Sequence, residues 1–502
     1  MPRVSTAPGP VPPPDQAEHA APAAEHHAGA SPVRQGSRVV IIGGGPGGYE
    51  AALVASQLGA RVHVVERQGM GGSAVLTDVV PSKTLIATAE WMTVTEQAGE
   101  LGIGAEDDGA GGALRADMDV VDRRVVRLAQ KQSRDIRGRL EREGVQITLG
   151  TGRLAPGLSP AGTRDVLITT SEGEELRDEA EIVLVATGAT PRILPTAEPD
   201  GERILTWAQM YNLTEIPEHL VVIGSGVTGA EFAGAYNALG AQVTLVSSRE
   251  RVLPGEDENA AELIEAVFRR RGMTVLSRSR AAGVTRTGDG VAVELTDGRV
   301  VEGSHCLVAV GGVPATAGMG LEEAGVELSP SGHVQVDRVS RTRALRVYAA
   351  GDCTGVLPLA SVAAMQGRIA MWHALGDAVS PLDLGVVAAN IFTAPEIATI
   401  GVTQKQIEDG EVDGDVTRLP LSRNPRAKML GIKEGFIKLF SDRSTGTVLG
   451  GVVVAPRAAE LVYPITIAVT ERLTVDQLAN VFTIYPSLTG SIAEAARTLH
   501  RA

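Results

Sequence analysis

Short runs of β-branched residues that end in glycine-rich loops form the clearest hydrophobic pattern in this chain. The first run, residues 38–42, has the continuous apolar character of a strand buried on both faces. A glycine loop at 43–48, an apolar helical stretch at 49–55 and a second strand-like run at 62–65 follow it. This order predicts a β–α–β unit with a tight turn after its first strand.

The loop of this unit has the spacing G-x-G-x-x-G, and each glycine has a separate physical role. Gly43 permits the tight turn, Gly45 lets a pyrophosphate approach the backbone, and Gly48 lets the helix pack on the strand. The helix N-terminus then meets the phosphates. Glu66 ends the second strand, where a carboxylate can accept hydrogen bonds from ribose hydroxyls. The unit therefore predicts a dinucleotide-binding site.

The same pattern recurs in the middle of the chain. Residues 219–223 and 242–246 are strand-like, and the loop 224–229 between them repeats the glycine spacing. The glycines of this second loop are Gly224, Gly226 and Gly229. Two such units in one chain predict one tightly held dinucleotide and one that exchanges during turnover.

The ribose position of the second unit differs from that of the first. The offset that leads from the first loop to Glu66 leads here to Ser247, and Arg249 and Arg251 follow. Without a carboxylate, nothing repels a 2′-phosphate, and two guanidinium groups are placed to pair with it. We therefore expect NADPH to be preferred, with NADH still usable. The alternative is that both arginines simply face solvent.

Composition narrows the class of protein. At 502 residues the chain is too long for one core, and its net charge of −14 argues against a nucleic-acid partner. No apolar run approaches the roughly 18 residues of a membrane span. Cys306 and Cys353 are its two cysteines, far apart in strand-like sequence, so we expect them to be buried and inert, in a reducing cytoplasm. We expect no metal site, and residues 1–36 read as a disordered tail.

In combination, the motifs of this chain resemble the pyridine nucleotide-disulfide oxidoreductase family, which includes dihydrolipoamide dehydrogenase and glutathione reductase. The resemblance covers nearly the whole chain from residue 38. Besides the two glycine loops, it rests on the G-G…P-S-K block at 71–83, A-T-G-x-x-P-R at 186–192, A-G-D at 350–352 and F-T-A-P-E at 392–396.

The resemblance implies an α/β fold with two Rossmann-like dinucleotide-binding domains, for FAD and NAD(P), and a C-terminal α+β dimerisation domain. The FAD domain would span 37–194 and 312–382, the NAD(P) domain 195–311, and the interface domain of an obligate homodimer 383–502. The residues that the resemblance implies as FAD contacts are Gly43, Gly45, Gly48, Glu66, Gly72, Lys83, Thr187, Gly188 and Asp352.

Lys83 is the residue that the resemblance places at the centre of the chemistry. Pro81 suits a helix start, so we expect Lys83 in the first turn, where a cation opposes the helix dipole and needs another reason to be present. The resemblance implies that Lys83 lies beside the flavin N5 and pairs with Glu231. A cation there stabilises reduced flavin and helps it to accept hydride. The alternative is an ordinary surface salt bridge.

The chain departs from the family at four positions that carry dithiol chemistry. Redox members have C-x-x-x-x-C in the G-G…P-S-K block, where this chain has Ala74 and Val79. The catalytic histidine and its orienting glutamate, which the partner subunit supplies in those members, are replaced by Tyr485 and Gly490. Tyr485 is a poor base, but it can donate to a quinone carbonyl or stack on a ring. The alternative is that it only fills the space of the imidazole.

These features predict an FAD-dependent NAD(P)H:quinone oxidoreductase with Lys83, Glu231 and Tyr485 as its catalytic residues. The chain most resembles an actinobacterial branch of the family that lacks the cysteines and reduces quinones. A soluble pyridine nucleotide transhydrogenase, which also runs on flavin alone, is the alternative enzyme. A non-catalytic, redox-sensing flavoprotein is the alternative outside enzymology. Reduction of lipoamide or glutathione is disfavoured because no pair of thiols is positioned for it.

Overall fold

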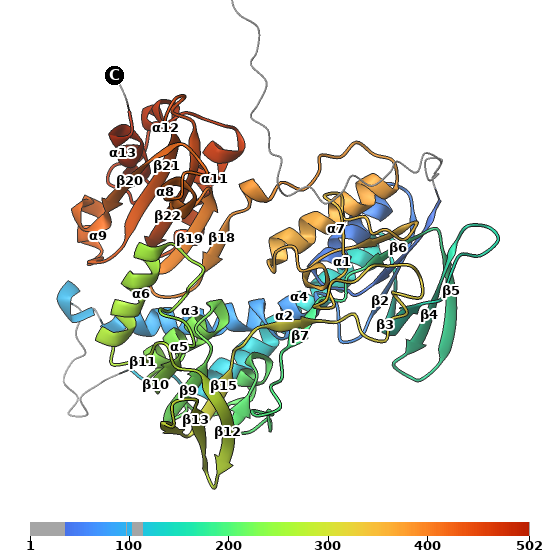
Figure 1. The fold of residues 1–502 in the computed structure, drawn as a ribbon, viewed down its shortest axis with the longest axis horizontal. Coiled ribbons are helices and arrows are strands. Elements are labelled where there is room, and N and C mark those ends of the chain that lie inside the picture. The colour runs from blue at the N-terminus through green and yellow to red at the C-terminus, as the bar shows by residue number, and fades with distance from the viewer. Residues whose placement is uncertain (1–35, 97, 103–113, 501–502) are drawn as a thin grey trace, which may run out of the picture.

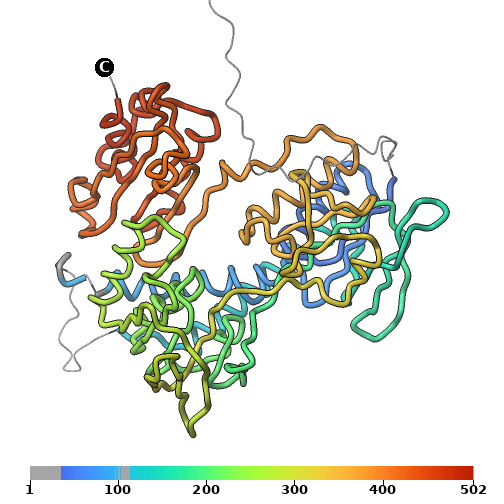
Figure 2. Tube along the Cα trace, in the orientation of Figure 1, coloured from blue at the N-terminus to red at the C-terminus, as the bar shows by residue number. Residues whose placement is uncertain are grey.

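The computed structural model describes residues 36–96, 98–102 and 114–500, which form three units built on β-sheets (Figure 1). The tail predicted at 1–36 lies outside the described residues except for Gly36. The colours of Figure 2 show that the first unit joins the N-terminal part of the chain to a later segment, whereas the second and third units each use one continuous stretch. The middle unit is therefore inserted into the first.

The first unit is built on a mostly parallel sheet. Its strands are β1 (Arg38–Ile42), β2 (Arg61–Glu66), β3 (Gln146–Leu154), β4 (Arg164–Thr170), β5 (Glu175–Ala180), β6 (Ile182–Val185) and β17 (Val347–Ala349). They lie in the order β17-β6-β1-β2-β3-β4-β5, and among the described strands of this sheet only the β3-β4-β5 ribbon is antiparallel. The strands predicted at 38–42 and 62–65 are confirmed as β1 and part of β2.

Helices cover this sheet, and glycine sets how closely two of them approach. The helical elements are α1 (Pro46–Gln57), α2 (Gly72–Leu76), α3 (Val79–Glu96), η1 (Ala98–Leu101), α4 (Met118–Arg142), η3 (Asp352–Thr354) and α7 (Ala360–Ala374). Figure 1 shows α1 beside α7. A Cβ on Gly367 of α7 would lie 2.0 Å from the carbonyl oxygen of Gly47 in α1, so the contact requires glycine.

The second unit repeats the parallel architecture. Its sheet has the order β11-β10-β9-β15-β8, and its pairs are parallel. These strands are β8 (Ile204–Leu205), β9 (His219–Ile223), β10 (Gln242–Val246), β11 (Thr274–Leu276) and β15 (His305–Val308), with η2 (Trp207–Asn212), α5 (Val227–Leu239) and α6 (Glu258–Arg270) around them. An antiparallel meander adds β12 (Ala281–Thr287), β13 (Gly290–Leu295) and β14 (Val300–Gly303). The strands predicted at 219–223 and 242–246 are confirmed.

A small antiparallel ribbon marks where the chain enters and leaves the second unit. It pairs β7 (Ala189–Pro191) with β16 (Gly312–Pro314), directly before and after that insertion. The two crossings of the chain are thus held together by backbone hydrogen bonds.

The third unit is an antiparallel sheet with helices against it. Its strands, in the order β18-β19-β22-β21-β20, are β18 (Ala389–Ile391), β19 (Glu396–Gly401), β20 (Gly414–Pro420), β21 (Phe436–Asp442) and β22 (Val448–Ala455). Its helical elements are η4 (Leu384–Val386), α8 (Gln404–Glu408), η5 (Leu421–Arg423), α9 (Pro425–Met429), α10 (Ala458–Leu461), α11 (Tyr463–Thr470), α12 (Val475–Asn480) and α13 (Gly490–Thr498). In the described part of the chain, no helix combines the length and the apolar content needed to cross a bilayer.

One hydrophobic core joins the three units. Leu85 and Ile86 of α3, Phe232 of α5, and Ile391 and Phe436 of the third unit belong to the same cluster of buried side chains. In Figure 1, α3 extends from the first unit across the second and beneath the third. The position of α3 therefore depends on packing from all three units.

A buried lysine adds a polar contact between the second and third units. The side chain of Lys438, on β21, is 1 % exposed, and its ammonium group donates to both carboxylate oxygens of Asp257 at 2.9 and 2.7 Å. It also donates to the side-chain oxygens of Asn259 at 2.9 Å and Gln404 at 2.7 Å. Asp257 caps α6, accepting from the backbone N–H of Ala260. The lysine thus ties the N-terminus of α6 to the third sheet.

Replacing Lys438 by methionine should lower the thermal stability of the protein. The substitution leaves the Asp257 carboxylate buried without its cation, and breaking a buried ion pair in this way costs about 3–5 kcal/mol. We expect a clear fall in the calorimetric Tm. The control is Lys405→Met, which removes a cation that pairs with Asp409 at the exposed surface and should change the Tm little. Equal Tm values for the two variants would contradict the anchoring role.

Candidate functional site

The first glycine loop forms an open cradle at the end of β1. Gly43 has φ +107°, and a Cβ there would lie 2.2 Å from the carbonyl oxygen of Ala186, so the turn requires glycine. A Cβ on Gly48 would lie 1.9 Å from the carbonyl oxygen of Gly43. At Gly45, the N-cap of α1, a Cβ would meet no atom within 4 Å. Space in front of a helix N-terminus fits a pyrophosphate.

The G-G…P-S-K block packs directly on this loop. The backbone N–H of Gly71 donates to the carbonyl of Gly44 at 2.8 Å. Gly72 has φ +55°, and a Cβ there would lie 2.9 Å from the Cα of Gly45. The block and the loop therefore share one backbone-lined surface, as expected if Gly72 and Gly45 contact the same ligand.

One of the polar residues predicted around FAD has no hydrogen-bond partner among the described residues. The hydroxyl of Thr187 is buried and makes no hydrogen bond to the described residues, and the next residue, Gly188, has φ +69°. Burial raises the pKa of the Asp352 carboxyl. Glu66 is buried and accepts hydrogen bonds from the backbone N–H groups of Gly44 at 2.5 Å and Gln68 at 2.7 Å. A buried hydroxyl without a partner fits a polar cofactor.

The structure brings Lys83 and Glu231 together, although they are far apart in the sequence. The ammonium group of Lys83 donates to a carboxylate oxygen of Glu231 at 2.7 Å, and the Glu231 side chain is only 4 % exposed. The expected helix start was wrong by two residues, because α3 begins at Val79. Proline is tolerated within a first turn, so Pro81 follows the start and Lys83 falls in the second turn. The alternative of an ordinary surface salt bridge does not fit a buried carboxylate.

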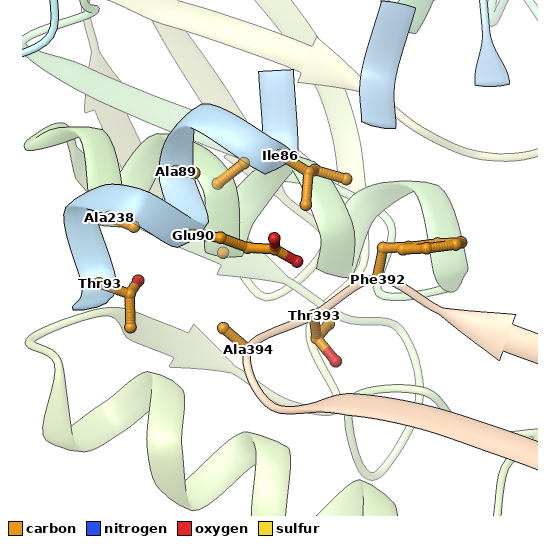
Figure 3. A pocket seen from close by; sticks show the side chains of 10 residues that line it. Ile86, Ala89, Glu90, Thr93, Ala238, Phe392, Thr393 and Ala394 are labelled. Atoms are coloured by element: carbon orange, nitrogen blue, oxygen red, sulfur yellow. The ribbon is translucent and has the colours of Figure 1, made fainter. Parts of the chain in front are cut away.

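The segment that enters the third unit closes over this ion pair. The backbone N–H of Phe392 donates to the other carboxylate oxygen of Glu231 at 2.9 Å. The Phe392 ring centroid lies 5.0 Å from the ammonium nitrogen of Lys83, within cation–π range. Figure 3 shows the loop beside α3 and α5, with Glu90 pointing into the space between them. Sequence reasoning gave Phe392 no site role, although the F-T-A-P-E motif was the available signal.

A second acid near Lys83 was also missed. Burial raises the pKa of the Asp78 carboxyl to about 6, with Glu231 and Asp352 reinforcing that shift and Lys83 opposing it. The hydroxyl of Tyr211, on η2, donates to the backbone carbonyl of Asp78 at 3.3 Å. The sequence feature that could have identified it is an acidic residue inside the G-G…P-S-K block, directly before Val79, one of the two positions that lack a thiol.

An open, mostly apolar cavity of about 170 Å³ lies between α2, α3, α4 and η2. The residues that line it are Leu76, Pro81, Val125, Val126, Ala129, Gln130 and Tyr211. Gln130 and Tyr211 are its polar members. The cavity thus adjoins the start of α3 on the side where Tyr211 contacts the backbone of Asp78.

The second glycine loop has the same geometry as the first. Gly224 has φ +109°, with its Cβ position 2.2 Å from the carbonyl oxygen of Ala309. A Cβ on Gly229 would lie 1.8 Å from the carbonyl oxygen of Gly224, whereas one on Gly226 would meet no atom within 4 Å. The second unit therefore also presents a helix N-terminus that fits a phosphate.

The residues predicted for the 2′-phosphate are placed differently from one another. Ser247 is fully buried, and its hydroxyl pairs with that of Ser225 at 2.7 Å. Arg249 is exposed, while Arg251 forms an ion pair with Glu258 at 2.6 Å. Ser247 thus supports the turn from within, and Arg249 is the arginine that has no acidic partner among the described residues.

No dithiol is available at the redox position. Ala74 lies in α2 and Val79 begins α3, both half-buried. The two cysteines are buried and unpaired, as expected, and burial raises the pKa of the Cys353 thiol to about 11 and that of Cys306 further still. A thiol with so high a pKa carries almost no thiolate at neutral pH.

Tyr485 lies on the third unit, in the segment between α12 and α13. Its side chain is 82 % exposed, and Gly490 begins α13. Large apolar side chains are exposed near it in the sequence, namely Val481, Phe482 and Ile484. Exposed apolar side chains of this size are common at protein interfaces.

Comparison with known proteins identifies the family of two consecutive segments of the chain. Residues 37–367 match the family model for pyridine nucleotide-disulphide oxidoreductases, and residues 387–496 match the dimerisation domain of the same family. The chain is 53 % identical to the NAD(P)H dehydrogenase (quinone) of Mycobacterium tuberculosis, over 92 % of this chain and 94 % of that protein. It is 31 % identical to a dihydrolipoyl dehydrogenase of Chlorobaculum parvum, over 91 % and 96 %.

Solved structures agree with this assignment. The crystal structure of LpdA from Mycobacterium tuberculosis superposes with a TM-score of 0.88 at 52 % identity, covering 93 % of this chain and 100 % of that one. A flavoprotein disulfide reductase, RclA from Escherichia coli, shares the fold with a TM-score of 0.80 at 22 % identity, covering 92 % and 99 %. The predicted fold class is therefore confirmed.

The two glycine loops should be separable by substitution. Gly45→Ala should lower the retention of FAD, and Gly226→Ala should instead raise the KM for NADPH by about tenfold or more, since a hydrogen bond to a charged group contributes about 1.5–3 kcal/mol. The measurements are the ratio of flavin to protein absorbance and steady-state kinetics. Gly99→Ala is the control, because its added Cβ also meets no atom within 4 Å. Loss of FAD from the Gly226 variant alone would contradict the assignment.

Proposed function

Because this chain belongs to the pyridine nucleotide-disulphide oxidoreductase family, we propose that it is an FAD-dependent NAD(P)H:quinone oxidoreductase that works without a redox disulfide. The observation that carries the proposal is the contrast within one block. Lys83 keeps its pairing with the buried carboxylate of Glu231, while Ala74 and Val79 hold no thiol. The relative of 53 % identity, which is named as a quinone-reducing dehydrogenase, supports the same acceptor class.

Bound FAD would supply the two-electron redox chemistry, as in the family. The residues proposed to hold it are Gly43, Gly45, Gly48, Glu66, Gly72, Lys83, Thr187, Gly188 and Asp352. Lys83 would place its ammonium group at the reacting end of the cofactor, and Glu231 and Phe392 hold that group in position. A fixed cation in a partly dry site stabilises negative charge that develops there.

NADPH is the proposed hydride donor in the second unit. Gly224, Gly226 and Gly229 would receive its pyrophosphate, with Ser247 supporting the turn. Arg249, which is exposed and without an acidic partner, supports recognition of a 2′-phosphate, whereas Arg251 would first have to leave Glu258. With this division we propose the domain boundaries 37–194 with 312–382, 195–311, and 383–502.

The dimerisation domain supports a homodimer, and we propose that Tyr485 acts across it. Its exposure on the third unit leaves the ring free to meet a partner subunit. There it would cover a quinone ring or donate a hydrogen bond to a quinone carbonyl.

A panel of electron acceptors tests the proposed function. With NADPH as donor, we expect rapid turnover with menadione and none above background with lipoamide, because no thiol pair can mediate dithiol exchange. The measurement is the loss of NADPH absorbance under anaerobic conditions. Transfer to thio-NAD but not to menadione would replace the proposal by the transhydrogenase alternative. Failure of NADPH to bleach the flavin would favour a non-catalytic flavoprotein.

The role of Tyr485 has its own test. Tyr485→Ala should raise the KM for menadione several-fold while leaving the KM for NADPH unchanged, because the nucleotide binds in a different unit. Tyr463→Ala, which removes another exposed tyrosine of the third unit, serves as the control. Unchanged menadione kinetics in the Tyr485 variant, in a protein that remains dimeric, would reduce this residue to a space-filling role.

A further inference from the structure

The exposed segment that carries Tyr485 is fixed by hydrogen bonds that begin at Ser487. The segment joins α12 to α13, and the side chains of Phe482, Ile484 and Tyr485 are exposed. Within the described part of the chain, none of residues 482–486 takes part in a hydrogen bond. The first hydrogen-bonded residue after the Tyr485 ring is therefore Ser487, and the position of the ring depends on what holds that residue.

The side chain of Asn424 holds Ser487. Asn424 precedes α9 and is 7 % exposed, and its Nδ2 donates to the backbone carbonyl of Ser487 at 2.9 Å and to the hydroxyl of Ser491 at 2.7 Å. Its Oδ1 accepts from the backbone N–H groups of Arg426 at 2.8 Å and Ala427 at 3.1 Å, which caps α9. The amide thus uses both of its donor hydrogens and accepts two hydrogen bonds, so its orientation toward Ser487 is fixed.

Apolar packing holds both sides of this contact in one core. Leu421 and Ala427, on either side of Asn424, are fully buried. They belong to the same hydrophobic cluster as Ile492 of α13, and Leu488 packs against that cluster. Because packing fixes the backbone on both sides, a side chain shorter than asparagine would leave the facing carbonyl without this donor.

Resting on the proposed role of Tyr485 across the dimer, we propose that Asn424 is a positioning residue for quinone reduction. It fixes the backbone two residues after Tyr485, and so sets where that ring reaches into the site of the partner subunit. Asn424 acts through the ring, because its own side chain is buried within the third unit. Its loss should therefore change how well the quinone is held, and should leave the reduction of the flavin by NADPH unaffected.

Two substitutions separate this contact from the cap on α9. Asn424→Ser keeps a hydroxyl that can cap the helix, but it is too short to reach Ser487. Asn424→Asp keeps the cap and the length of the side chain, and Ser491 can still donate to the carboxylate, but the carbonyl of Ser487 loses its donor. Both variants should raise the KM for menadione about threefold, within the range expected for one neutral hydrogen bond. The KM for NADPH and the rate of flavin reduction should stay unchanged.

A double-variant cycle tests whether the effect passes through the Tyr485 ring. If it does, adding Asn424→Ser to Tyr485→Ala should raise the KM for menadione no further, because the ring that Asn424 positions is already absent. Thr403→Ala is the matched control, since Thr403 caps α8 in the same unit and makes its side-chain hydrogen bonds to Gln406. It removes a helix cap without touching the Tyr485 segment, so menadione kinetics should not change.

Calorimetry and gel filtration establish that the variants compared are folded dimers. Among these, an unchanged KM for menadione in both Asn424 variants, while Tyr485→Ala raises it, would overturn the inference alone. Additive effects of Asn424→Ser and Tyr485→Ala would also overturn it, because Asn424 would then act by another route. Unchanged menadione kinetics in Tyr485→Ala itself would instead remove the proposed role of that ring, and with it the inference, so the two failures are distinguishable.

Discussion

The ion pair between Lys83 and Glu231 is the contact on which the rest of the site depends. Glu231 is almost fully buried, and a buried carboxylate is stable only if its oxygens are paired and hydrogen-bonded. Lys83 pairs with one oxygen and the backbone of Phe392 donates to the other, so the three partners come from three different units. The relative position of those units is thus tied to the satisfaction of one charge.

Without the thiols, the proposed step that changes is the transfer of electrons from the flavin to the acceptor, rather than their delivery from NAD(P)H to the flavin. Both glycine loops and the buried ion pair keep the steric and electrostatic conditions for binding two dinucleotides. Ala74 and Val79 put small apolar groups where a disulfide would take electrons onward. Small apolar side chains at these two positions suit the proposed planar, weakly polar acceptor better than they suit a dithiol.

Lysines occupy two of the junctions between units, and of these Lys438 is fully buried and Lys83 is partly buried. Lys438 ties the third sheet to the start of α6, as Lys83 ties α3 to α5. Each ammonium group needs acceptors in a defined geometry, whereas apolar packing in the shared core tolerates small shifts. These polar contacts therefore specify how the units are oriented, while the common hydrophobic core around α3 supplies most of the burial.

The sequence by itself determined the features whose causes are local. Only glycine meets the steric requirements of the two loops, which are positive φ at Gly43 and Gly224 and close backbone approach at Gly48 and Gly229. The spacing of glycines in the sequence therefore predicts these turns. The β-branched strands and the absence of a thiol pair can likewise be identified from the sequence alone. The pairing of Lys83 with Glu231 was expected through family resemblance, not from local pattern.

Tertiary structure alone decided the features that depend on burial and on distant neighbours. Residues 148 positions apart form the central ion pair, and Phe392 joins it from the third unit. Ser247 turns inward to Ser225, and the carboxyl of Asp78 is shielded among other charges. A residue's desolvation and its charged neighbours follow from how separate segments pack, and no local spacing in the chain records them.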